Sequence, residues 1–228
     1  MFCKEHNFFG GHGIVGGQIP LGAGLAFADK YQETGAVTFT YMGDGAIRQG
    51  SFHETMNLAM LWNLPVVFVI ENNGYAMGTS VERTANHTDL YKLGLGYEMP
   101  CSAVDGMDPV EVYNAMHEAA TRARKGNGPT LLEVRTYRYK GHSMSDAQHY
   151  RTKDEVAEFQ KRDPIGIVQK MLQDKKYASD DDFKAIEKRV KELVSECVKF
   201  ADDSDFPTAD NLYKHVYIQN DYPFIKTN

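Results

Sequence analysis

Two polar positions in the first half of the chain have the residue types of a cation–phosphate site. Asp44 lies between Gly43 and Gly45, and Asn73 lies in an Asn-Asn-Gly sequence further along the chain. A carboxylate and an amide oxygen are hard ligands of the kind that Mg²⁺ prefers. The flanking glycines would let a phosphate group approach the backbone, whose N–H groups bind anions. The pair therefore predicts a site for Mg²⁺ and a phosphorylated ligand.

The elements around these motifs would place both at one edge of a sheet. Residues 37–42 are β-branched and aromatic and predict a strand that ends just before Asp44. Ser51 and Glu54 have the spacing of a capping box, which predicts the start of a helix. Residues 65–71 form an apolar run typical of a buried parallel strand. A strand, a helix and a strand make a right-handed crossover, so both strand ends face the same edge.

Two further side chains are predicted to lie at this edge. Residues 130–139 predict a third strand that Arg138 ends, and His142 follows in the next loop. An arginine and a histidine suit a diphosphate there, although the alternative is an ordinary surface loop. Gly-Asp-Gly and Asn-Asn-Gly are likewise common turns when each stands alone. The combination of these positions along one edge is what predicts a binding site.

The remaining patterns complete an α/β chain with a helical appendage. Helices are predicted for residues 17–33, 108–126, 152–162, 164–175 and 179–202. The stretch from 72 to 107 is polar and punctuated by glycine. Alternating strands and helices predict a largely parallel sheet. We expect a binding domain at residues 1–150, followed at residues 151–228 by helices and a tail that pack on this domain and on a partner subunit.

The composition gives no reason to expect a nucleic-acid or membrane partner. The 228 residues carry a net charge of −6 without a block rich in Lys and Arg. No run approaches the roughly 20 apolar residues of a membrane span. Cys3, Cys101 and Cys197 are odd in number and lack a CxxC spacing, which indicates free thiols in a reducing compartment. We expect a cytoplasmic protein in a bacterium, or a protein of the mitochondrial matrix in a eukaryote.

A glycine-rich segment near the start matches a second motif. Residues 11–16 have the GxGxxG spacing of dinucleotide-binding proteins, but that motif needs a preceding strand and residues 1–10 lack a strand pattern. The glycines fit better as backbone pressed against a flat ring. The histidines form neither HExxH nor a Cys/His cluster, and no nucleophile elbow is present. An enzyme with this sequence would therefore take its reactive group from a cofactor.

Several longer strings resemble one family. The Gly-Asp-Gly to Asn-Asn pattern resembles the thiamine-diphosphate motif, and the likeness to α subunits of the pyruvate dehydrogenase decarboxylating component rests on GGHGIVGGQIPLGAG, ENNGYAMGTSVERTA, VDGMD and TYRYKGHSMSDAQHYRT. It runs from about Phe8 to Pro164 and continues more weakly. The resemblance implies a three-layer thiamine-diphosphate-binding fold with thiamine diphosphate and Mg²⁺ as cofactors. It also implies decarboxylation of pyruvate and reductive acetyl transfer to the lipoyl groups of a transacylase, in an α2β2 heterotetramer with a β subunit.

The resemblance assigns roles at the anionic end of the cofactor. It implies that Asp44 and Asn73 hold Mg²⁺ through their side chains, and that Tyr75 holds it through its backbone carbonyl. Asn73 would thereby also be a cofactor contact. Diphosphate contacts are implied for Gly43, Gly45, Ala46 and Arg138.

Further roles are implied at the ring end and at the entrance. Gly13 and Val15 would hydrogen-bond the aminopyrimidine through main-chain atoms, and Met77 would be the apolar wedge that keeps the cofactor bent. His142 would lie beside the diphosphate and the substrate entrance, and it is the expected catalytic residue. In this family the glutamate that activates the aminopyrimidine belongs to the β subunit, so none is expected here.

Two alternatives stay open beside pyruvate dehydrogenase. The substrate could be a branched-chain 2-oxo acid or acetoin, because the pocket is shared with the β subunit. Members of this family have a further stretch before the position of Phe8 that contributes phosphate ligands, so we expect an N-terminal segment to be missing. In that case the chain could be a non-catalytic subunit that only assembles with β.

Overall fold

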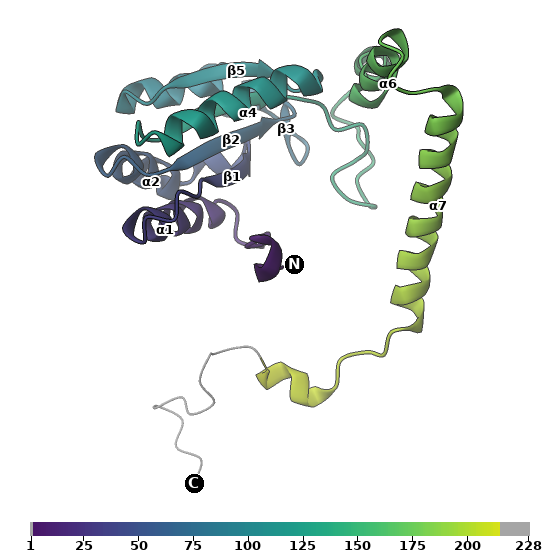
Figure 1. The fold of residues 1–228 in the computed structure, drawn as a ribbon, viewed down its shortest axis with the longest axis horizontal. Helices are drawn as coiled ribbons and strands as arrows, with labels where there is room; N and C mark the ends of the chain where they lie inside the picture. Colours follow the sequence, from purple (N-terminus) through teal and green to yellow (C-terminus); the bar gives the residue numbers. More distant parts are fainter. Residues whose placement is uncertain (1, 215–228) are drawn as a thin grey trace. The chain divides into compact units, whose positions relative to one another are not determined.

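The structure is a computed structural model that describes residues 2–214 (Figure 1). Tertiary contacts divide the chain into two units, Met1–Met171 and Leu172–Asn228. The first unit contains the sheet, and the second contains the longest helix. The predicted tail continues past residue 214, so its expected packing on a partner falls outside the described residues. The predicted domain boundary after residue 150 stays a prediction.

The elements alternate between strands and helices through the first unit. The strands are β1 (Thr38–Gly43), β2 (Val66–Asn72), β3 (Tyr75–Ala76), β4 (Thr79–Ser80), β5 (Cys101–Asp105) and β6 (Thr130–Arg135). The α-helices are α1 (Gln18–Tyr31), α2 (Gly50–Leu61), α3 (Val81–Thr84), α4 (Pro109–Arg124), α5 (Lys153–Gln160), α6 (Pro164–Asp174) and α7 (Asp180–Asp203). Shorter 3₁₀ turns are η1 (Lys4–His6), η2 (Ala46–Arg48), η3 (Leu90–Tyr97) and η4 (Ala209–Tyr213). Among the helices of residues 2–214, none is both long and apolar enough to cross a membrane.

The main sheet is parallel, with the strand order β1-β2-β6-β5. Gly43 pairs with Glu71 at the end of β1, and Asn72 pairs with Arg135 at the end of β6. The carboxyl ends of all four strands therefore lie along one edge, as the sequence predicted. A separate antiparallel hairpin, β3–β4, follows β2.

Helices cover both faces of the sheet, which makes three layers. Residues of β2 alternate between two cores, because Phe68 and Ile70 pack with α1 and α2, whereas Val67 and Val69 pack with α4. All four side chains are at most 1% exposed. Figure 1 shows α4 lying along the strands. The predicted three-layer, largely parallel α/β class is confirmed.

One predicted strand boundary was wrong, and one strand of the main sheet was missed. The third strand ends at Arg135, so Arg138 does not end it. The Thr136 N–H donates to the Asn72 carbonyl, and the chain then leaves the sheet. The edge strand β5 was not predicted, because its sequence CSAVD has neither a long apolar run nor a clean alternation.

The helix ends agree with one predicted helix start, near residue 108, and contradict one predicted cap. Asp108 caps α4, accepting hydrogen bonds from the N–H groups of Val110 at 2.8 Å and Glu111 at 3.3 Å. The capping box predicted at Ser51 is wrong, because α2 begins one residue earlier, at Gly50, and its N-cap makes no side-chain bond. The N-cap is Gln49, in an extended conformation.

Candidate functional site

The turn after β1 holds a buried carboxylate. Asp44 directly follows the paired residue Gly43, and its side chain is 5% exposed. Burial raises the pKa of the Asp44 carboxyl, while the positive charges of Arg138 and Arg48 act in the opposite direction. Among the described residues, no other side chain hydrogen-bonds this carboxylate. A backbone N–H also lowers this pKa, but no charged side chain of residues 2–214 pairs directly with the carboxylate, so Asp44 is suited to an added cation.

The turn after β2 is organised by two asparagines. The side-chain oxygen of Asn72 accepts the N–H of Gly74 at 3.0 Å, and that of Asn73 accepts the N–H of Tyr75 at 3.1 Å. Gly74 has a φ of +81°, a conformation that favours glycine. Each asparagine thus bonds the backbone two residues on, which fixes the shape of the turn.

The turn after β1 is in contact with the β3–β4 hairpin. A Cβ atom built on Gly45 would lie 2.8 Å from the Cβ atom of Ala76, the residue after Tyr75. The structure therefore brings the Gly-Asp-Gly sequence against the hairpin that directly follows the Asn-Asn-Gly sequence. Ala46 is buried at the start of η2. Two of the predicted diphosphate contacts, Gly45 and Ala46, lie beside Asp44 in the chain and next to the hairpin.

Arg138 lies against the same hairpin, although it is not on a strand. Its guanidinium donates to the backbone carbonyls of Tyr75 at 3.3 Å and Met77 at 2.7 Å, and to the Tyr150 hydroxyl at 2.9 Å. Met77 is 64% exposed and has a φ of +55°. Arg138 thus links the β3–β4 hairpin to the loop before α5.

The loop that carries His142 is held by Asp146, a residue that the sequence patterns did not single out. Asp146 accepts the N–H groups of His142 at 2.8 Å and Gln148 at 2.9 Å, and the Tyr150 hydroxyl at 2.8 Å. The backbone N–H of His142, followed by that of Gln148 and by the Tyr150 hydroxyl, lowers the pKa of Asp146 to about 2. The His142 side chain is exposed. Tyr150 bonds both Asp146 and Arg138, so this loop is connected to the hairpin.

The glycine-rich segment before α1 approaches the site at one residue. A Cβ atom on Gly16 would lie 2.8 Å from the Gln49 side chain and 3.4 Å from the Ala46 carbonyl. Gly13 and Val15 are exposed, and a Cβ atom on Gly13 would have no neighbour within 4 Å. The structure thus brings this segment to the Ala46 turn, with open space beside Gly13.

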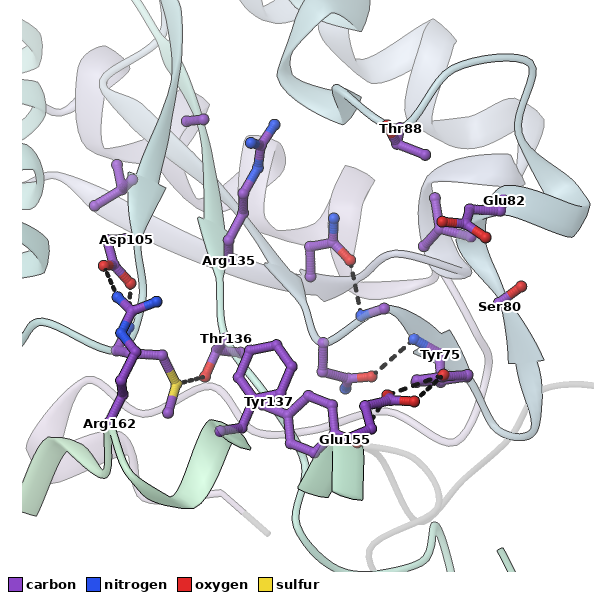
Figure 2. Close-up of a pocket in the computed structure, with 18 residues that line it drawn as sticks. Tyr75, Ser80, Glu82, Thr88, Asp105, Arg135, Thr136, Tyr137, Glu155 and Arg162 are labelled. Carbon is purple, nitrogen blue, oxygen red and sulfur yellow. Dashed lines mark hydrogen bonds and ion pairs between the residues drawn. The ribbon is translucent and has the colours of Figure 1, made fainter. Parts of the chain in front are cut away.

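A cavity of about 660 Å³ extends from the hairpin toward β5 and β6. In Figure 2 the Glu155 carboxylate points at the Tyr75 hydroxyl, which donates to it at 3.0 Å. The Tyr137 hydroxyl donates to the same carboxylate at 2.9 Å. Burial, followed by this bond, raises the pKa of Tyr137 to about 12. Sequence patterns missed Glu155, because a glutamate in the first turn of a helix is commonplace.

The predicted ligand set fits one hard cation. Within residues 2–214 no group of three His, Cys, Asp or Glu side chains is placed to hold a metal, whereas the predicted set combines one carboxylate with amide and carbonyl oxygens. The Tyr75 carbonyl already accepts from Arg138, but a carbonyl oxygen has two lone pairs and can serve a second partner. The turn of Asp44 contacts the hairpin that carries Tyr75 and follows Asn73, and a shared cation requires such an approach.

Comparisons with known proteins show the family of the chain. Residues 1–210 match the sequence model of the family described as dehydrogenase E1 component. The chain is 50% identical over 217 residues to the pyruvate dehydrogenase E1 component subunit alpha of Rickettsia felis, covering 95% of this chain and 67% of that protein. It is 47% identical to the protein of the same name from Rhizobium meliloti, covering 96% and 63%. It is 43% identical to subunit alpha-3, chloroplastic, of Arabidopsis thaliana, covering 95% and 52%.

Among solved structures, a candidate thiamin diphosphate-dependent enzyme from Mycobacterium smegmatis covers 53% of this chain and 22% of its own, at 23% identity and a TM-score of 0.42. This partial likeness adds nothing to the family match. The chain spans about two thirds of the length of its Rickettsia relatives and less of the others. Because the family's sequence model covers nearly the whole chain, the protein belongs to the dehydrogenase E1 component family.

Proposed function

We propose that the chain is the α subunit of an acetyl-transferring pyruvate dehydrogenase. The identity of about half of all residues with proteins of that name supports the assignment. The structural observation that carries it is the buried Asp44 carboxylate, which has no side-chain partner among the described residues and lies in a turn that touches the hairpin directly after Asn73. A site of this kind suits Mg²⁺ with a diphosphate.

The residues at the sheet edge would hold Mg²⁺ and thiamine diphosphate together. Asp44 and Asn73 would bind the cation through their side chains, and Tyr75 would bind it through its carbonyl. The diphosphate would lie against Gly43, Gly45, Ala46 and Arg138. When bound, thiamine diphosphate supplies the carbon nucleophile and the electron sink for decarboxylating a 2-oxo acid.

Other residues would orient the cofactor and the substrate. Gly13 and Val15 would offer main-chain atoms to the aminopyrimidine, and the open space beside Gly13 leaves room for a ring. Met77 would press on the cofactor from its exposed position, held by the bond from Arg138 to its carbonyl. His142 would face the 2-oxo acid at the entrance, on a loop that Asp146 fixes.

The reaction would need partners. A β subunit would supply the glutamate that activates the aminopyrimidine, and the two chains would form an α2β2 heterotetramer. The acetyl group would pass to a lipoyl group of a transacylase, whose disulfide is reduced. The three cysteines of the chain are unpaired, which suits a reducing compartment such as a bacterial cytoplasm or a mitochondrial matrix.

Reconstitution tests this proposal. The chain, a β subunit, thiamine diphosphate and Mg²⁺ are combined, and release of CO₂ is followed with pyruvate, with a branched-chain 2-oxo acid and with acetoin. We expect turnover, with pyruvate as the preferred substrate. Asp44→Ala should abolish this turnover, whereas Glu118→Ala, which removes an exposed carboxylate on α4, should retain it. Preference for another substrate would overturn the pyruvate assignment. Assembly with β and cofactor binding without any turnover would indicate a non-catalytic subunit.

A further inference from the structure

One carboxylate lies in the middle of the sheet, where a strand should be apolar. Glu133 is the fourth residue of β6, in the sequence TLLEVR, and its side chain is 0% exposed. An ionised carboxylate in such a place is strongly unfavourable unless hydrogen bonds and a positive charge compensate for its lost hydration. The chain keeps a glutamate where leucine or valine would pack at no such cost.

Glu133 has a full set of partners. It accepts from the Asn72 side-chain amide at 2.8 Å, from the Tyr91 backbone N–H at 3.0 Å and from the Arg135 guanidinium at 3.1 Å. Arg135 also pairs with Asp89 at 2.8 Å, and that pair is open to solvent. The arginine supplies the compensating charge. The bond to Asn72 is therefore not needed for charge compensation.

Asn72 connects this carboxylate to the turn after β2. Only the NH₂ group of an asparagine can donate to a carboxylate, so the bond to Glu133 determines which way the Asn72 amide faces. The amide oxygen must then point the other way, where it accepts the N–H of Gly74 at 3.0 Å. The next residue in the chain, Asn73, makes the same kind of bond and accepts the N–H of Tyr75.

We propose that Glu133 is a positioning residue for the metal site. Its buried carboxylate orients the Asn72 amide, and that amide holds the turn which presents the Asn73 side chain and the Tyr75 carbonyl to the cation. This inference rests on the proposed function, because it assigns Glu133 a role in the same site. Glu133 itself touches neither metal nor cofactor.

Glutamine at position 133 separates this role from simple packing. It has nearly the same shape, but one of its two polar atoms becomes a donor and meets a donor of Asn72, Tyr91 or Arg135. If Glu133 acts through Asn72, Glu133→Gln and Asn72→Ala both loosen the turn and weaken the same property, the affinity for Mg²⁺. The double variant is then no worse than the more affected single one.

The experiment uses the chain assembled with its β subunit at saturating thiamine diphosphate, and it measures Mg²⁺ binding by titration calorimetry beside initial rates against Mg²⁺ concentration. Glu133→Gln and Asn72→Ala are expected to raise the half-saturating Mg²⁺ concentration about 10- to 100-fold, the usual effect of removing a residue that orients a metal ligand. The kcat at saturating Mg²⁺ should stay nearly unchanged. Asp89→Asn, which breaks the exposed end of the Arg135 pair without touching Asn72, is the matched control and should behave as wild type.

The outcomes separate the inference from the proposed function. If Asp44→Ala abolishes the response to Mg²⁺ while Glu133→Gln lowers only the unfolding temperature, Glu133 is a packing residue and the inference is overturned. A wild-type assembly that shows no response to Mg²⁺ would overturn the proposed function as well. If Glu133→Gln does not fold, the half-buried Asn72→Ala is judged by the same shift in Mg²⁺ dependence, and an unchanged value overturns the inference.

Discussion

Gly45 and Ala76 bring the Gly-Asp-Gly turn against the β3–β4 hairpin, because a Cβ atom on Gly45 would lie 2.8 Å from that of Ala76. The Gly-Asp-Gly turn can therefore reach the β3–β4 hairpin only with glycine at this position. Asp44 and Tyr75, each adjacent to one of these residues, are brought to the same place by this contact.

Gly45→Ala should push the hairpin away from the Asp44 turn. Overpacking of this kind costs about 1–3 kcal/mol of stability, and the displaced hairpin should weaken Mg²⁺-dependent cofactor binding. Ala76→Gly removes the opposing methyl group, so the double variant should regain most of the stability and the binding. Thermal unfolding and calorimetry would measure the two effects. A double variant as impaired as Gly45→Ala would show that the contact is not the cause.

Two glycines of α1 offer a matched test of the packing between this helix and the sheet. A Cβ atom on Gly22 would lie 1.9 Å from the Thr40 hydroxyl oxygen on β1, whereas a Cβ atom on Gly24 would have no neighbour within 4 Å. Gly22→Ala should therefore be strongly destabilising. Gly24→Ala should stabilise the helix by about 0.5–1 kcal/mol, because alanine favours a helix over glycine. Denaturant unfolding of both variants checks this, and equal effects would contradict the packing described.

Asp44 should show a conflict between stability and binding. Burial raises its pKa, so in the folded chain without a metal the ionised carboxylate is less favourable than in the unfolded chain. Asp44→Asn removes the charge at nearly constant shape and should raise the unfolding temperature of the metal-free chain while weakening Mg²⁺ binding. Wild-type Mg²⁺ affinity should also fall as the pH drops toward the raised pKa, because protons compete for the carboxylate. A variant less stable than wild type would contradict the assigned burial cost.

The loop around His142 should depend on the charge of Asp146. The pKa of Asp146 is lowered from 3.8 to about 2 by the bonds that it accepts, so its stabilising effect is complete above pH 3.8 and is lost as the pH falls through about 2. Asp146→Ala should expose Arg138 and Lys140 to trypsin at neutral pH, since the loop loses three hydrogen bonds. Asp154→Ala, an exposed carboxylate on α5, is the control. Equal cleavage of both variants would count against the role of Asp146.

The sequence predicted those features that depend on residues close together in the chain. Val67 to Ile70 form an apolar run that could only be a buried strand, and Asp108 before Pro109 is a local signal for a helix start. The position of Asp44 and Asn73 at one sheet edge follows from the crossover rule alone.

The missed features all depend on contacts between distant parts of the chain. Glu133 was not singled out from the sequence, because its partner Asn72 lies on another strand. Arg138 was expected at a strand end and instead reaches the hairpin from a loop, through bonds to carbonyls that no sequence pattern encodes. The edge strand β5 gains its structure from pairing with β6, since its own sequence has little strand character.

The central claim is that Asp44 and the Asn73 turn hold Mg²⁺ with thiamine diphosphate. Titration calorimetry of thiamine diphosphate into the chain assembled with its β subunit, with and without Mg²⁺, tests it most directly. Wild type should bind only when Mg²⁺ is present, and Asp44→Ala should lose at least tenfold in affinity, about 1.4 kcal/mol. Unchanged, Mg²⁺-dependent affinity in Asp44→Ala would contradict the claim.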